Sequence, residues 1–154
     1  MPFPFMKILC AVDFEDNSMA ALDTAARLAR ESGGTVEVLH VVPIMIQPGA
    51  MPMHLDVYAA EQEAAKAKLI QIAKDHLGGV KYELRTSVGQ PAIAILHAQK
   101  TLGAEVIVMG THGRRGLSHF ILGSVAEHVV REAYCPVLTV RPPRASDQTT
   151  DAPA

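Results

Sequence analysis

Two glycine-containing segments in the C-terminal third of the chain have the residue types and the spacing of an anion-binding loop. The first is Gly110-Thr111-His112-Gly113, and the second, nine residues later, is Gly123-Ser124. A largely apolar run, 104–109, precedes them, and a helix-like stretch, 125–132, follows. Backbone N–H groups in such a loop and at a helix start point at one spot, and glycine leaves room for an anion there. The order of strand, glycine loop and helix therefore predicts a cradle for nucleotide phosphates, with a plain strand-to-helix connection as the alternative.

Side chains beside the glycines supply further phosphate ligands. Arg114 can pair with phosphate oxygens and His112 can donate to them, although both residue types are also common in exposed loops. The Ser124 hydroxyl and the Val125 N–H come at the helix start, where a phosphate could use both. Ser124 also fits a capping box with Glu127, and the capping and binding roles are compatible.

An acidic residue at the end of another apolar run is the second kind of candidate. The run 7–12 is continuously apolar after its first residue and closes on Asp13, which is typical of a central parallel strand covered on both faces. The Asp13 carboxylate can accept a hydrogen bond from a ribose hydroxyl or an adenine amine. Its alternative role is that of an acid leading the next helix and interacting with the helix dipole.

Several enzyme signatures are absent from the sequence. No G-x-x-x-x-G-K-[ST] motif is present, and no G-x-G-x-x-G follows the first apolar run, which argues against a P-loop NTPase and a standard dinucleotide site. The seven histidines show no metal-ligand spacing. We therefore assign no catalytic and no metal-binding residue.

The elements that must position these residues alternate between strand and helix. Hydrophobic patterning predicts strands over 7–13, 35–42, 80–88, 104–109 and 136–141, with a helix in each interval. This pattern predicts an α/β fold: a single-domain, doubly wound, Rossmann-like, five-stranded parallel sheet of order 3-2-1-4-5, with helices on both faces. In that order Asp13 and Gly110 end neighbouring strands and converge on the crevice where such folds bind ligands.

Composition narrows the classes of protein to consider. The chain has 154 residues, of which 49% are hydrophobic, and a net charge of −2, which suits one globular domain. No basic block indicates nucleic-acid binding, no apolar run reaches the ~20 residues that span a bilayer, and the N-terminus does not resemble a signal peptide. Cys10 and Cys135 have no metal-ligand spacing and are expected to be buried, reduced thiols. We expect a cytoplasmic protein with a short leader (1–5), one domain (6–141) and a disordered tail (142–154).

Taken together, several segments resemble the universal stress protein family. The similar segments are 8–13, Leu39-His40-Val41, Gly89-Gln90-Pro91, Met109 to Gly113, Gly123 to Glu127, and Cys135 to Leu138. The spacing G-x2-G-x9-G-[ST] is similar to that of the ATP-binding subgroup of this family. The resemblance covers residues 6–141.

The resemblance implies an adenine-nucleotide site and a dimer. Ala11, Val12 and Asp13 would line the nucleoside side, and the backbone of Val41 would meet adenine. Ribose and phosphates would be held by Met109, Gly110, His112, Gly113, Gly123, Ser124 and Val125. Members of the family typically dimerise through the last strand, which corresponds here to residues 137–140, an apolar sheet edge that should not stay bare.

Together with the resemblance, these observations predict an ATP-binding stress-response protein that acts as a homodimeric regulator or sensor and has an unknown protein partner. No residue of the motif is an evident base for orienting water, so we expect at most slow ATP hydrolysis, with Mg²⁺ bridging the phosphates. One alternative is an ATP-using hydrolase or nucleotidyl-transfer enzyme with His112 or Asp13 in the chemistry. Another is a dimeric scaffold that binds no nucleotide.

Overall fold

Five strands and four helices alternate along the part of the chain that the computed structural model describes, which is residues 4–44, 48–49, 55–112 and 122–142. In chain order they are β1 (Lys7–Ala11), α1 (Asp16–Ser32), β2 (Thr35–Pro43), α2 (Leu55–His76), β3 (Lys81–Gly89), α3 (Pro91–Leu102), β4 (Val106–Gly110), α4 (Ser124–Glu132) and β5 (Val137–Val140). The strands and helices predicted from the sequence are all confirmed, with small shifts at their ends. Asp13 therefore lies in the loop after β1, not within the strand.

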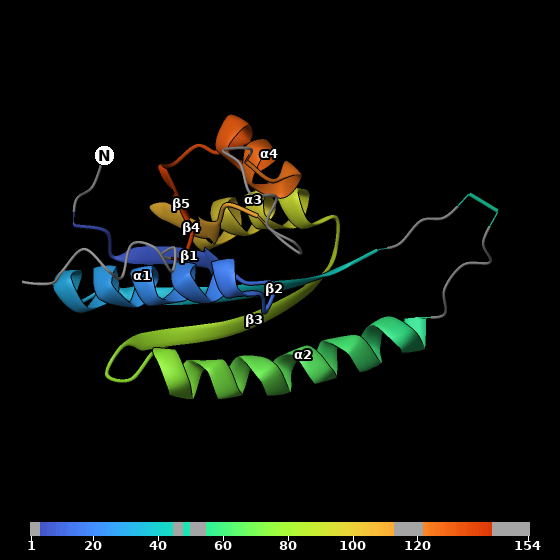
Figure 1. Cartoon of the computed structure of the whole chain (residues 1–154), viewed down its shortest axis with the longest axis horizontal. Helices are drawn as coiled ribbons and strands as arrows, with labels where there is room; N and C mark the ends of the chain where they lie inside the picture. The colour runs from blue at the N-terminus through green and yellow to red at the C-terminus, as the bar shows by residue number, and fades with distance from the viewer. Residues whose placement is uncertain (1–3, 45–47, 50–54, 113–121, 143–154) are drawn as a thin grey trace, which may run out of the picture.

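The strands form one parallel sheet of order β3-β2-β1-β4-β5 (Figure 1), which confirms the doubly wound order. In the register, Ala11 of β1 lies between Leu39 of β2 and Met109 of β4. The chain leaves β1 toward β2 and later crosses to β4 on its other side. The carboxyl ends of β1 and β4 thus meet at the topological switch point, where this type of sheet accommodates ligands.

Helices cover both faces of the sheet, α1 and α2 on one face and α3 and α4 on the other (Figure 1). Successive residues of β1 enter the two cores in turn, with Ile8 and Cys10 beneath α1 and α2 and Leu9 beneath α3 and α4. All three side chains are fully buried. The uninterrupted apolar run of β1 therefore reflects a central strand that is covered on both sides.

Both cysteines are free, Cys10 buried and Cys135 half-buried. Burial raises the pKa of the Cys10 thiol. Burial also raises the pKa of the Cys135 thiol, against a smaller lowering by a backbone hydrogen bond to Ile107. Both thiols therefore stay protonated near neutral pH and lack the thiolate character of a reactive cysteine.

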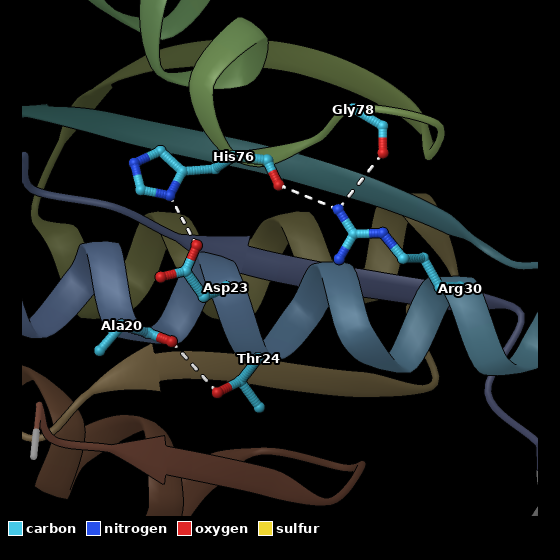
Figure 2. Close-up of polar contacts among 6 residues, drawn as sticks. All are labelled: Ala20, Asp23, Thr24, Arg30, His76 and Gly78. Atoms are coloured by element: carbon cyan, nitrogen blue, oxygen red, sulfur yellow. Dashed lines mark hydrogen bonds and ion pairs between the residues drawn. The ribbon is translucent and has the colours of Figure 1, made fainter.

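Polar contacts tie the second half of α1 to the C-terminal end of α2 (Figure 2). The Asp23 carboxylate lies 2.6 Å from Nδ1 of His76. The Arg30 guanidinium donates to the His76 and Gly78 carbonyls over 3.4 and 3.3 Å. His76 is the last residue of α2, so Arg30 satisfies a carbonyl group that the helix end leaves without an intrahelical partner, and its bond to Gly78 holds the turn that follows. None of the helices that the structure describes combines the length and the apolar character needed to span a bilayer.

Candidate functional site

Gly110 allows the end of β4 to pack directly against the start of α1. A Cβ atom at Gly110 would lie 2.8 Å from Cβ of Asn17 and 3.1 Å from the backbone nitrogen of Ser18. The first separation is far below van der Waals contact, so a side chain at this position requires the backbone to move. Sequence reasoning gave this glycine an anion-binding role, and the structure adds a packing role that joins β4 to the start of α1.

Asp13 organises that loop through its backbone and side chain. Its Oδ1 accepts hydrogen bonds from Oγ of Ser18 over 2.8 Å and from the Glu15 N–H over 2.9 Å. Its own N–H donates to the same Ser18 oxygen over 3.1 Å. Ser18 is only 3% exposed, whereas Asp13 is exposed. The second carboxylate oxygen has no partner in the described residues and can accept a hydrogen bond from a ligand.

Val41 lies just beyond the point where β1 stops. The Val12 N–H donates to the Leu39 carbonyl over 2.9 Å, and β1 contributes nothing further to the ladder with β2. Backbone groups point alternately to the two sides of a strand, so those of Val41 face the same side as those of Leu39. They point past the end of β1, while the Val41 side chain is buried beneath α3 and α4. The backbone contact of Val41 with adenine stays a prediction.

The amino end of α4 is fixed directly beyond β4. The Gly123 N–H donates to the Thr111 carbonyl over 2.7 Å, and the Gly123 carbonyl accepts the first helical bond from the Glu127 N–H over 2.8 Å. The three N–H groups of residues 124–126 come before that bond and have no intrahelical partner. The helix start therefore presents three donors and the positive end of its dipole beside the end of β4.

The predicted capping role of Ser124 is wrong. Gly123 occupies the N-cap position, with φ −61° and ψ 157°, and Ser124 is the first residue of the helix. The physical reason is the bond from Gly123 to Thr111, which sets the point at which the chain turns into the helix. The Ser124 side chain is exposed and is not needed to cap the helix.

His112 carries an unpartnered nitrogen at this edge. Its Nδ1 lies 3.1 Å from Oγ1 of Thr111, a residue that is 8% exposed. Its Nε2 is buried and has no hydrogen-bond partner among the residues that the structure describes. A buried polar atom without a partner is costly, and a bound acceptor such as a phosphate oxygen would satisfy it.

The structure brings most of the predicted site residues to one edge of the sheet, at and just beyond its carboxyl ends. These are Ala11, Val12, Asp13, Val41, Met109, Gly110, His112, Gly123, Ser124 and Val125. Gly113 and Arg114 lie outside the described residues. Sequence reasoning assigned no site role to Ser18 or His40. The five-residue separation of Asp13 and Ser18 is a weak signal for the role of Ser18. Nothing in the spacing of the sequence indicates the role of His40.

The edge has the donors of an anion site. Within the described ranges, no group of three or more His, Cys, Asp or Glu side chains is placed to hold a metal ion. The arrangement combines helix-start amides and a buried imidazole nitrogen beyond the end of β4 with the Asp13 carboxylate beyond the end of β1. This set suits a ligand with an anionic end and a hydroxyl-bearing or amine-bearing end.

Comparison with known proteins gives a consistent family relationship. Residues 4–141 match the profile of the Universal stress protein family. The chain is 36% identical over 147 residues to universal stress protein YxiE of Bacillus subtilis, in an alignment covering 89% of this chain and 99% of that protein. It is 32% identical over 145 residues to universal stress protein MJ0531 of Methanocaldococcus jannaschii, covering 91% and 84% of the two chains.

A solved structure adds a ligand-bound neighbour. The chain is similar to the universal stress protein from Archaeoglobus fulgidus in complex with dAMP, with a TM-score of 0.62 and 27% identity. The similarity covers 88% of this chain and 98% of that one. An adenine nucleotide is thus bound by a protein that shares nearly the whole fold.

Proposed function

Because the chain belongs to the universal stress protein family, we propose that it is a stress-response regulator that binds ATP at the crevice between β1 and β4. The observation that carries the proposal is the α4 start held 2.7 Å from Thr111 beside the buried, unpartnered Nε2 of His112. The helix-start amides are donors without acceptors, and Nε2 of His112 is also a donor in the tautomer whose Nδ1 accepts from the Thr111 hydroxyl. Phosphate oxygens are acceptors. The dAMP complex of the Archaeoglobus fulgidus neighbour supports an adenine nucleotide as the ligand class.

The two sides of the crevice divide the nucleotide between them. The phosphates would lie against residues 123–125 and His112, with Gly113 and Arg114 as further predicted contacts. The nucleoside would lie toward Asp13, whose Oδ2 is open to a ribose hydroxyl or adenine amine, and toward the backbone of Val41. Ala11, Val12 and Met109 would form the floor of the site at the ends of β1 and β4.

We propose binding with at most slow hydrolysis. Oδ1 of Asp13 is already bonded to Ser18 and Glu15, which suits a fixed ligand contact better than a group that exchanges protons with water. Mg²⁺ would be held chiefly by the phosphates, as is usual for this ion. The nucleotide would then act as a retained signal whose presence changes the binding of a cytoplasmic protein partner.

Self-association through β5 completes the proposal. β5 pairs only with β4 among the described strands, so its other edge is unpaired, and Leu138 is 39% exposed. An unpaired apolar edge strand is a template for another strand, and a second copy would cover it. Leu138→Asp should convert a dimer to a monomer in analytical ultracentrifugation, whereas Val57→Asp, a similarly exposed site on α2, should not. An unchanged dimer in Leu138→Asp would place the interface elsewhere.

The binding proposal is tested by titrating purified protein with ATP and with adenosine in a calorimeter. His112→Leu should weaken ATP binding about tenfold, because ~1.4 kcal/mol is lost with one donor to phosphate. Adenosine affinity should stay the same, since it has no phosphate. His97→Leu, a change at an exposed histidine of α3, serves as the matched control.

Mass spectrometry of small molecules released from denatured wild-type protein complements the titration. Co-purified ATP would support the proposal directly. A wild-type protein that releases no nucleotide and gives no heat with ATP would overturn it and favour the nucleotide-free scaffold.

A further inference from the structure

Phe14, the residue after Asp13, has a left-handed backbone conformation with a φ of 69°. In the part of the chain that the structure describes, it is the one non-glycine residue with positive φ. Bulky side chains rarely adopt this conformation, and it persists only where the surroundings hold it. The sequence does not use glycine here, so contacts around Phe14 have to hold this conformation, in addition to the hydrogen bonds of Asp13 with Ser18 and Glu15.

Two residues from separate elements contact that ring. The ring centroid lies 4.4 Å from that of His40 on β2, with a tilt of 33° between the planes. The ammonium group of Lys68 on α2 lies 5.2 Å from the phenyl centroid, within the range of a cation–π contact. Phe14 therefore joins the loop after β1 to both β2 and α2.

His40 also fixes the backbone just before Asp13. Its Nδ1 lies 2.8 Å from the Val12 carbonyl oxygen. A carbonyl can only accept, so the His40 Nδ1 carries the proton. The Val12 N–H is bonded to the Leu39 carbonyl at the same time. Both polar backbone groups of Val12 are thus held by β2, although β1 has already ended at Ala11.

We propose that His40 is a positioning residue for the nucleotide site, an inference that rests on the proposed function. Its Nδ1–H holds the Val12–Asp13 peptide, and its ring supports Phe14 on the far side of Asp13. The backbone is fixed immediately before and immediately after Asp13, so the carboxylate meets the nucleoside without having to be ordered on binding. Through Lys68, the same contact links α2 to the segment that binds the nucleoside.

A pair of substitutions separates the hydrogen bond from the packing. In His40→Asn the side-chain amide nitrogen occupies the δ position and can donate to the Val12 carbonyl as Nδ1 does. In His40→Gln the amide nitrogen is one bond farther out and loses that geometry. Both variants lose the ring that contacts Phe14, so a difference between them reports the bond to Val12.

We expect His40→Gln to bind ATP and adenosine about tenfold more weakly than His40→Asn, with both ligands affected because the nucleoside side is disturbed. Thermal melting of the two variants identifies any difference in folding. In wild-type protein, ¹⁵N spectra should show His40 protonated at Nδ1, and the amide resonance of Asp13 should shift in His40→Gln but stay near its wild-type position in His40→Asn.

The outcomes distinguish a failure of the positioning role of His40 from a failure of the proposed nucleotide binding. Wild-type affinity for ATP and adenosine in both variants overturns the positioning role alone, because both contacts of the ring and, in His40→Gln, the bond to Val12 would then be dispensable. A His40 ring protonated only at Nε2 also overturns it, because the bond to Val12 then cannot form. A wild-type protein that binds neither ATP nor adenosine overturns the proposed function and this inference with it.

Discussion

At the amino ends of the strands, polar groups find partners within the chain, whereas at the carboxyl ends several are left for something else. Lys7 Nζ donates to the Leu102 carbonyl over 3.2 Å, and the Met6 N–H donates to the Glu105 carboxylate over 2.6 Å. At the other edge, Nε2 of His112 has no partner in the described residues, and the first amides of α4 precede its first helical bond. Polar groups at the amino edge of the sheet therefore bond to other parts of the chain, whereas those at the carboxyl edge include groups that are available to a ligand.

One buried polar atom near the amino edge is an exception to this contrast. Oε1 of Gln99, near the amino edge, is also buried and without a partner in the described part of the chain. Its amide nitrogen, however, donates to the Ala104 carbonyl over 3.2 Å, so the side chain already serves the turn between α3 and β4. A single orphan atom therefore does not define a site. At the carboxyl edge the orphan imidazole nitrogen occurs together with a free helix start and a constrained loop.

The largest expected difference between the edges comes from glycine-to-alanine substitution. Gly110→Ala should lower the free energy of unfolding by about 1–3 kcal/mol, because the new Cβ overlaps Asn17 and forces β4 away from α1. Gly78→Ala, at the amino edge, should be neutral or slightly stabilising, since nothing lies within 4 Å of the added atom. Urea denaturation measures both. Equal stabilities would show that the edges are equally tolerant and would remove the packing role of Gly110.

A second difference is expected between two serines of α1. Ser18→Ala removes the buried partner of Asp13 and should cost about 1–3 kcal/mol of stability. It should also weaken nucleotide binding, because the Asp13 carboxylate keeps only the bond from the Glu15 N–H and is less firmly oriented. Ser32→Ala, at the other end of the same helix, removes only a bond from the Gly34 N–H and should leave affinity unchanged. Thermal melting measures the stability of each variant, and calorimetric titration with ATP measures its affinity. A fall in ATP affinity in Ser32→Ala would contradict the assignment of the nucleotide role to Ser18.

The smallest effect is expected where α1 meets the end of α2. Asp23→Asn weakens a hydrogen-bonded contact with His76 in which the carboxylate is 60% exposed, and exposed polar pairs contribute about 0–1 kcal/mol. Arg30→Ala, which removes two long bonds to carbonyls, should cost slightly more. Neither change should alter ATP affinity. A variant that keeps its melting temperature but loses nucleotide would show that this contact also serves the binding edge.

Elements and their order were predictable because they depend on periodic burial. The continuous apolarity of 8–12 predicted a central strand, and β1 lies in the middle of the sheet with its side chains buried on both faces. The convergence of Asp13 and Gly110 followed from the strand order alone. Each of these inferences needs only the local pattern and the handedness of the crossovers.

Contacts that depend on the register of neighbouring strands could not be predicted from the local sequence pattern. The bond from His40 to Val12 joins residues that are far apart in the sequence, and it exists because of where β1 stops relative to β2. The capping prediction for Ser124 failed for a similar reason, since a bond between Gly123 and Thr111 decides where α4 begins. The orphan nitrogen of His112 depends on its burial, which local patterning does not specify.

The unequal lengths of β1 and β2 have a consequence for how such a site can change. β1 has five residues and β2 has nine, and the pairing of the two strands ends at Ala11 and Leu39. The backbone groups of Val41 are therefore not used by β1 because this ladder stops early, and this opening requires no particular side chain on β2. Many different residues could occupy this stretch of β2 without closing the opening. An insertion that extended β1 by one more rung would fill it, because the backbone groups of Val41 would then be used by the sheet itself.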